Sequence, residues 1–241
     1  MYMKKIIFLI SVLLAIGCSN SGGNEKTMIV QGNVEGLKKG TIFLQQFDGE
    51  KLVNIDSVEA KGSGEFTFKK EILSPEIFYI FLDLGKKQDQ TFGDRLAFFG
   101  EPTTITINSK HELFDIHAKI EGSESQKLWE EYSKNIRKFN IRNLELLEIQ
   151  LKSIKEGYQP KADSLAKIIE KNQLRRHLYA LNFAITHGDS HVAPYIVLTD
   201  VPDTNVKYLD SVYNSLTPEI TAAKYGKELK EYINKVKEKN Q

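Results

Sequence analysis

The residue with the clearest chemistry in this chain is its single cysteine, Cys18. It follows an apolar run over residues 6–16 that is too short to span a bilayer and that comes after a short positive segment. Residues 14–17 (LAIG) complete a lipobox, the pattern at which a lipoprotein signal is cut and the cysteine is acylated, with Ala15 where leucine is more usual. The sequence therefore predicts a signal peptide over residues 1–17 and a lipid anchor on Cys18, rather than a buried free cysteine behind an ordinary signal peptide.

A lipid on Cys18 would decide both the location and the redox chemistry of the chain. Stable anchoring needs about two acyl chains, each buried methylene contributing roughly 0.8 kcal/mol, and a diacylated or triacylated cysteine provides them. Ser19 follows the cysteine in place of the aspartate associated with inner-membrane retention, so we expect an outer-membrane anchor facing the periplasm. With its one thiol acylated, the chain has none left for disulfides, CxxC redox chemistry, thiolate catalysis or cysteine metal sites.

Two histidines four residues apart, His187 and His191, flank Asp189, and this spacing can hold zinc on a continuous helix. Gly188 interrupts that helical face, and Asp189 or Ser190 is well placed to cap a new helix. We therefore interpret this segment as the junction between two helices and predict no metal site.

The remaining charged groups have ordinary structural interpretations. Arg175, Arg176 and His177 are expected on a solvated helix face, paired with Glu170 or Asp163. Glutamates on the long helices are expected to be solubilising rather than acid–base pairs. The sequence holds no GxGxxG, Walker-type, GxSxG or HExxH motif, so it predicts no catalytic residue and no cofactor.

Trp129 and Tyr132 stand near the start of the first long helical pattern. At helical spacing such aromatic residues usually pack in a core, so we expect them to anchor the helical part against the strands. A sugar-stacking platform is the alternative interpretation.

Composition restricts the partners. The chain has 33 basic and 32 acidic residues, which gives no electrostatic argument for nucleic acid and no polybasic patch for a membrane surface. Its 41% hydrophobic residues are ordinary for a folded protein, so the part after the signal should form a substantial core.

The elements that would position these residues change in type along the chain. Residues 18–26 are small and polar, as in a flexible tether. Eight short β-type segments follow at the spacing of an antiparallel sandwich or barrel: 28–34, 41–47, 52–58, 65–72, 76–84, 95–99, 103–108 and 115–121. We therefore predict an antiparallel β-sandwich over residues 27–122.

Helical periodicity begins after Gly122, where Ser123 and Gln126 have the form of a capping box. The first helix is expected to reach about residue 156, with one buried face formed by Trp129, Tyr132, Ile136, Phe139, Leu147 and Ile154. Further helices are expected over residues 160–186, 190–198 and 204–216, the last of these capped by Asp203, and a charged helix follows. The predicted fold class is α+β, with an all-helical region over residues 123–241.

Several segments together resemble a known family: GSGEFTFKKEI, LAFFGEPTTITI, the EGSES junction, HGDSHVAPYIVL, YLDSVYNSLTPEI and KYGKELKEYI. They are similar to Bacteroidetes envelope lipoproteins in which an uncharacterised N-terminal β domain and a helical segment precede a thioredoxin-like domain of the TlpA or AhpC/TSA type. In those relatives the redox domain with its CxxC motif follows the segment that resembles YGKELKEYI, whereas this chain ends soon after it. The resemblance implies the fold, the lipid anchor and the envelope setting, but not the oxidoreductase activity.

These observations favour a non-enzymatic binding or scaffold module held at a membrane surface through lipidated Cys18. One alternative is an accessory subunit of a separately encoded thioredoxin-like oxidoreductase. Another is an enzyme whose site is assembled only in three dimensions. A deep pocket lined by acidic or histidine side chains would favour the enzyme, an exposed aromatic groove a glycan binder, and a broad apolar patch on the helices a protein partner.

Overall fold

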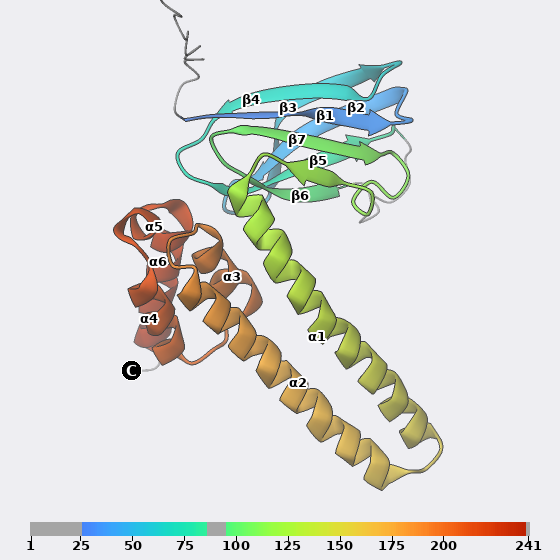
Figure 1. The fold of residues 1–241 in the computed structure, drawn as a ribbon, viewed down its shortest axis with the longest axis vertical. Helices are drawn as coiled ribbons and strands as arrows, with labels where there is room; N and C mark the ends of the chain where they lie inside the picture. The colour runs from blue at the N-terminus through green and yellow to red at the C-terminus, as the bar shows by residue number, and fades with distance from the viewer. Residues whose placement is uncertain (1–25, 86–94, 240–241) are drawn as a thin grey trace, which may run out of the picture.

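The computed structural model describes residues 26–85 and 95–239 (Figure 1). The predicted signal peptide and Cys18 lie outside the described residues. The strands are β1 (Thr27–Glu35), β2 (Lys39–Phe47), β3 (Leu52–Lys61), β4 (Glu65–Glu71), β5 (Glu76–Asp83), β6 (Arg95–Gly100), β7 (Thr104–Lys110) and β8 (Lys119–Glu121). The helices are α1 (Glu124–Lys155), α2 (Gln159–Thr186), α3 (Val192–Asp200), α4 (Val206–Ser215), α5 (Pro218–Ala222) and α6 (Lys224–Lys239).

The strands form two four-stranded sheets, in the orders β4-β1-β7-β8 and β3-β2-β5-β6. Neighbouring strands run antiparallel with one exception, the pair β1 and β7, which is parallel with Val30 opposite Ile105. The predicted α+β class with an N-terminal sandwich is confirmed, but the sandwich is not wholly antiparallel. The two-residue period that predicted the strands carries no information about their relative direction, so the parallel pair could not be read from it.

Alternation along the strands builds the core between the two sheets. Phe66 and Phe68 are buried, whereas Thr67 between them is exposed, as their spacing predicted. Ile105 and Ile107 repeat this pattern in β7. The largest fully buried side chains of this core come from both sheets and, in the case of Phe114, from the turn after β7: Met28, Ile42, Leu44, Phe68, Phe78, Ile80, Leu82, Phe98, Ile105, Ile107 and Phe114.

Strand β5 is buried on both faces because it lies between the sandwich core and the helices. Phe78 and Ile80 belong to the core between the sheets, whereas Ile77 packs in a second core with helical residues. In β6 the adjacent residues Phe98 and Phe99 divide in the same way. This explains why β5 has buried residues on both of its faces instead of the alternation seen in β4 and β7.

The last strand is shorter than predicted. A turn around Leu113, which has a φ of 52°, occupies the residues before Lys119. Ser109 stabilises this turn because its hydroxyl donates to the Phe114 carbonyl over 2.5 Å. The strand predicted over residues 115–121 is therefore reduced to β8.

Helix α1 begins where the capping residues predicted it. The Ser123 hydroxyl accepts a hydrogen bond from the Gln126 N–H over 2.9 Å. The Gln126 side chain does not return to Ser123, as a full capping box requires; its Oε1 accepts from the Phe99 N–H over 2.7 Å. The cap therefore also joins the helix to strand β6.

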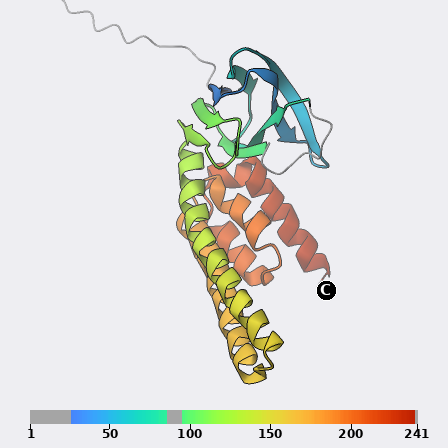
Figure 2. The same cartoon turned by 90° about the vertical axis from the view of Figure 1, so that its right-hand side faces the viewer.

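Helices α1 and α2 form an antiparallel hairpin that extends away from the sandwich, while α3 to α6 pack at its base (Figures 1 and 2). At about 1.5 Å per residue, the 32 residues of α1 span about 48 Å. We call the outer part of the hairpin, residues 140–178, the arm. Gly157, with a φ of 78°, stands in the loop that joins the two helices.

The face of α1 that packs against α2, which we call the seam of the hairpin, differs in part from the predicted buried face. Tyr132 and Ile136 are buried as expected, but Leu147 and Ile154 are exposed, and Leu146 and Ser153 are buried instead. A step of eight residues from Phe139 to Leu147 turns the side chain roughly 80° away from the seam, since each residue turns about 100°. Polar groups help to join the outer seam, as Asn172 Nδ2 donates to Asn143 Oδ1 over 2.7 Å.

Helices α3 and α4 follow the predictions with shifted boundaries, whereas the short helix α5 was not predicted. Helix α4 is capped by Asn205, whose Oδ1 accepts from the Lys207 N–H over 3.0 Å, and not by Asp203. Ser190 accepts from the Val192 N–H at the start of α3, so the predicted helix junction is confirmed.

Candidate functional site

The helices meet the second sheet through a cluster of aromatic side chains. Phe99 of β6 lies edge-to-face against Trp129 of α1, Tyr195 of α3 and Tyr225 of α6, with centroids 6.2, 5.5 and 6.2 Å apart. Trp129 therefore packs the helical part against the sandwich as predicted. Tyr132 packs mainly within the helices, stacked on Tyr179 at 5.9 Å.

Backbone groups of the sheet are bound by helix side chains at the same place. Ile77 and Phe99 lie opposite each other in β5 and β6. The Ile77 N–H donates to the Tyr225 hydroxyl over 2.9 Å, and the Phe99 N–H donates to Gln126. The Lys224 ammonium pairs with Glu76 at the start of β5. These contacts fix α1 and α6 relative to the sheet.

A cleft of about 560 Å³ opens between this sheet and the helices. Its lining includes Tyr79 from β5, Tyr195 from α3, Lys224, Tyr225 and Glu228 from α6, and Asp48 from the β2–β3 turn. These residues come from four separate segments of the chain, which is why spacing in the sequence gave no indication of the cleft. The side chains offer aromatic faces next to charged and hydroxyl groups, an arrangement suited to binding a small polar ligand.

The ionisable groups of the cleft have shifted pKa values with different causes. Burial raises the pKa of Tyr195 above that of a free tyrosine, so its hydroxyl stays protonated and can donate. Burial also raises the pKa of Glu228. The pKa of Asp48 is lowered, because its carboxylate accepts hydrogen bonds from the N–H groups of Lys51 and Glu50.

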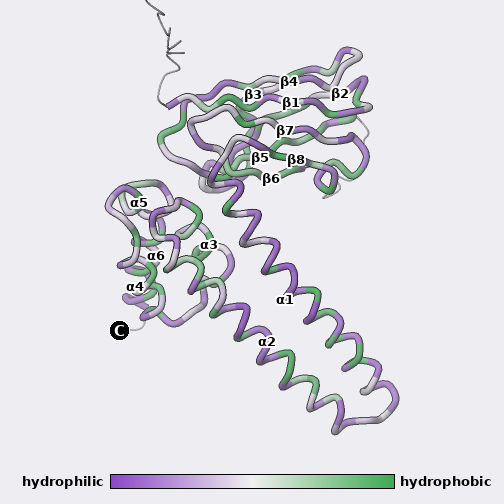
Figure 3. Tube along the Cα trace, viewed as in Figure 1, coloured by the Kyte–Doolittle hydropathy of each residue, from purple (hydrophilic) through white to green (hydrophobic). Residues whose placement is uncertain are grey.

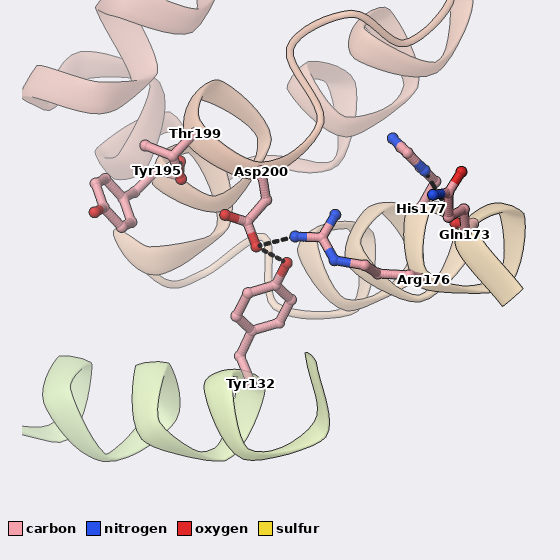
Figure 4. A network of polar contacts seen from close by, with 7 residues as sticks. All are labelled: Tyr132, Gln173, Arg176, His177, Tyr195, Thr199 and Asp200. Carbon is pink, nitrogen blue, oxygen red and sulfur yellow. Dashed lines mark hydrogen bonds and ion pairs between the residues drawn. The ribbon is translucent and has the colours of Figure 1, made fainter. Parts of the chain in front are cut away.

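A second polar cluster joins side chains of α1, α2 and α3 (Figure 4). The Tyr132 hydroxyl donates to Asp200 Oδ2 over 2.6 Å, and the Arg176 guanidinium contacts the same oxygen at 3.5 Å. Arg176 therefore does not lie on a solvated face as predicted, and its partner is Asp200 rather than Glu170 or Asp163. Burial raises the pKa of the Tyr132 hydroxyl, and the hydrogen bond to Asp200 raises it further.

This cluster borders a cleft of about 350 Å³ whose lining includes Arg137, Asn140, Arg176, Trp129 and Asp200. The Tyr195 hydroxyl points away from Asp200 (Figure 4), while residues of α3 line both clefts. Charged and aromatic side chains line both clefts.

The histidines of the helix junction have structural contacts. His187 ends α2, where its ring stacks on Phe183 at 4.1 Å and its Nδ1 lies 2.8 Å from the Phe183 carbonyl oxygen. Burial lowers the pKa of His191. Within residues 26–85 and 95–239, no group of three or more His, Cys, Asp or Glu side chains is arranged to hold a metal ion. No helix of this same part is long and apolar enough to cross a membrane.

The arm carries an unusual number of exposed large apolar side chains. They are Ile141, Leu144, Leu147, Ile149, Leu151, Ile154, Tyr158, Ile168, Leu174 and Leu178, between 41% and 66% exposed. Figure 3 shows apolar residues spread along both helices of the hairpin. Ordinary surfaces expose such residues singly, whereas here ten of them lie on one arm. We call these ten side chains the arm surface.

Residues 28–129 match the model of a protein family described as "Domain of unknown function (DUF4369)". The match spans the sandwich and continues into the first turns of α1, as far as Trp129. No curated protein and no solved structure gives a significant match to the chain. The N-terminal part of the chain is thus similar to an uncharacterised domain, as the resemblance in the sequence implied.

Proposed function

We propose that this chain is a non-enzymatic binding or scaffold module of the bacterial cell envelope, and that the arm surface binds a protein partner. The main observation that supports this proposal is the set of exposed apolar side chains on a hairpin that extends away from the rest of the fold. Exposed apolar area of this extent is costly in water unless a partner covers it. The sandwich and the short helices act as a rigid base that holds the arm at a fixed angle.

The proposal includes an anchor. Lipidation of Cys18 would tether the module, most simply to the periplasmic side of the outer membrane, through the polar residues that precede β1. From such a base the arm, on a helix about 48 Å long, would reach partners at a distance from the membrane.

Affinity isolation from crosslinked membranes tests the partner. The full-length chain is compared with the double variant Leu174→Glu/Leu178→Glu on α2 and with a control at Leu73, a loop residue that is 94% exposed. A protein other than the chain itself that is captured with wild type and with Leu73→Glu, but lost with the double variant, would support the proposal. Identical captures from all three would contradict it.

An accessory role for a separately encoded thioredoxin-like oxidoreductase is the more specific form of this proposal. The same arm surface supports it, because a soluble partner domain needs an exposed apolar area on which to dock. The identity of the captured protein decides between the two forms. A thioredoxin-like protein whose capture depends on Leu174 and Leu178 would favour the accessory role.

Small-ligand binding at the cleft lined by Tyr79, Tyr195 and Tyr225 is a second candidate function. Aromatic faces beside Asp48 and Glu228 suit a ligand with one apolar face and several hydroxyl groups, such as a saccharide. A thermal-shift screen with envelope saccharides tests it, because a ligand that binds the folded chain raises its unfolding temperature. Loss of that shift in Glu228→Gln would place the ligand in the cleft.

A further inference from the structure

One side of α1 carries hydrogen-bond donors that line the cleft of about 350 Å³. Trp129, Ser133, Arg137 and Asn140 follow each other at steps of four, four and three residues, which places them along the same side of the helix. Arg176 of α2 lines the same cleft. Each of these five side chains has at least one N–H or O–H group, so the lining is rich in donors.

The fold does not use the donors on this side of α1. Within residues 26–85 and 95–239, the side chains of Ser133, Arg137 and Asn140 have no hydrogen-bond or ion-pair partner. Arg142, further along the same helix, does have one, because its Nη1 lies 3.1 Å from Glu145. A ligand can therefore bind the donors of the cleft without displacing a partner that the fold provides.

Arg176 is held in place with several of its donors still available (Figure 4). Its Nη2 lies 3.5 Å from Asp200 Oδ2, and the same oxygen accepts a hydrogen bond from the Tyr132 hydroxyl over 2.6 Å. In the part of the chain that the structure describes, this is the one polar contact of the guanidinium. A guanidinium has five N–H donors in a planar fork that matches the geometry of an oxyanion. Asp200 therefore orients Arg176 while Nη1 and Nε can still bind a second acceptor.

The charges of the cleft favour an anion. Among its described lining residues, Arg137 and Arg176 are the bases and Asp200 is the only acid, which leaves one net positive charge. The carboxylate of Asp200 is already compensated in part by Tyr132 and Arg176. Only 21% of the Arg176 side chain is exposed, so salt screens its attraction for an anion less than it would at an open surface.

Apolar side chains complete the lining. Trp129 and Tyr195 lie edge-to-face with their centroids 6.1 Å apart, and the buried Ile136 and Ile196 also border the cleft. The volume of about 350 Å³ is near the lower end of the range that small-molecule pockets occupy. A ligand that uses the whole lining is therefore small and joins a charged group to an apolar one.

We propose that this cleft is an oxyanion site for a small organic anion in which a carboxylate or a phosphate monoester is attached to an apolar or aromatic group. The oxyanion accepts hydrogen bonds from Arg137 and Arg176, with Ser133 and Asn140 as further donors, and the apolar group packs on Trp129. The cleft shares no residue with the arm surface. Binding of an anion here is thus a function separate from binding of a protein partner on the arm.

The fluorescence of Trp129 tests the site directly, because it is the only tryptophan in the 241 residues. The purified full-length chain, kept in a non-ionic detergent, is titrated at low ionic strength with benzoate, with phenyl phosphate and with benzamide, a neutral probe of similar shape. We expect at least one anion to give a saturable change with a dissociation constant of about 1 mM or less, and benzamide to bind about tenfold more weakly or worse. The tighter of the two anions identifies the group as a carboxylate or a phosphate.

Two arginines of the hairpin provide a matched pair of variants. Arg137→Gln removes a charged donor from the cleft, whereas Arg175→Gln removes the same charge from an exposed residue that does not line it. We expect Arg137→Gln to weaken binding of the anionic probe about tenfold or more, because hydrogen bonds to charged groups are the strong ones. Arg175→Gln should leave the affinity within about twofold of wild type. Urea titrations of both variants check that the fold is unchanged.

Three results would each overturn the oxyanion site. They are the absence of saturable binding by either anion, binding of benzamide as tight as that of the anions, and equal losses of affinity in Arg137→Gln and Arg175→Gln. The protein partner of the arm surface is scored by capture from membranes, so either function can fail without the other.

Discussion

The hydroxyl of Tyr225 accepts a hydrogen bond from the backbone N–H of Ile77 over 2.9 Å, joining α6 to a strand that lies 148 residues earlier in the chain. On the neighbouring strand β6, the backbone N–H of Phe99 likewise donates a hydrogen bond to the side chain of Gln126 of α1. These two backbone N–H groups, which would otherwise need water as an acceptor, thus find acceptors on the side chains of the helices. The sandwich and the helical part share these bonds and a common core, so they should unfold together.

Substitution of Tyr225 by phenylalanine tests this coupling. The variant keeps the aromatic packing but leaves the Ile77 N–H without its acceptor, and a buried unpaired donor costs about 1–3 kcal/mol. We expect the free energy of unfolding to fall by about that amount in urea titrations. Tyr208→Phe, at a tyrosine that is 52% exposed, is the control and should change it by less than about 0.5 kcal/mol. Equal effects of the two variants would contradict the role assigned to Tyr225.

Two glycines at the ends of α1 should respond differently to alanine. Gly122 and Gly157 have φ values of 97° and 78°, so alanine is strained at both by about 1–2 kcal/mol. At Gly122 a Cβ would also lie 2.1 Å from the Thr104 carbonyl oxygen, whereas at Gly157 no atom lies within 4 Å. We expect Gly122→Ala to lower the free energy of unfolding by about 3 kcal/mol or more, and Gly157→Ala by clearly less. Similar losses would show that the close approach at Gly122 can relax.

Acid should destabilise the fold through His191. Burial lowers its pKa from the ordinary value of 6.5, an effect that Glu219 and Glu101 oppose but do not cancel. As pH falls below about 6.5, the unfolded chain binds a proton that the folded chain resists, so stability is lost in that window. We expect His191→Gln to flatten the dependence of the unfolding free energy on pH between about 6.5 and 5. His177→Gln, at an exposed histidine, is the control and should keep the wild-type slope.

Much of the architecture could be predicted because its causes are local. The alternation around Phe66 and Phe68 and the cap at Ser123 each depend on residues a few positions apart. The parallel pairing of β1 and β7 and the bond between Tyr132 and Asp200 join residues about 70 positions apart, and no local pattern encodes them. For the same reason Arg176 was expected in solvent, where its neighbours in sequence lie.

The candidate sites could not be predicted from local sequence patterns either. The cleft around Tyr195 draws on four segments, and no motif in any one of them indicates a site. The exposed apolar residues of α1 did have a signal, since Leu147 and Ile154 stand at helical spacing, but periodicity alone does not say whether such a residue is covered by the rest of its own chain. Only the position of α2 shows that these residues are left exposed.

The lipid anchor can be tested by phase partitioning. Wild-type chain expressed in a Gram-negative host should enter the detergent phase, because acyl chains on Cys18 dominate its partition. Cys18→Ala removes the acceptor thiol and should move the protein to the aqueous phase. Ser19→Ala leaves the cysteine in place and should partition like wild type. Detergent-phase recovery that does not change in Cys18→Ala would mean that something other than this cysteine holds the protein in membranes.

Thiol–disulfide exchange should be absent from the isolated chain. Exchange needs an attacking thiolate and usually a resolving thiol, and the 241 residues contain one cysteine, which the lipid would consume. In an insulin-reduction assay with dithiothreitol, we expect the purified chain to match the rate of the buffer alone, and Cys18→Ala to give the same rate. Addition of a captured thioredoxin-like partner is the informative comparison, because an accessory subunit would change the rate of that partner without any activity of its own. Turnover by the Cys18→Ala chain alone would require a reactive group other than a thiol and would overturn the non-enzymatic proposal.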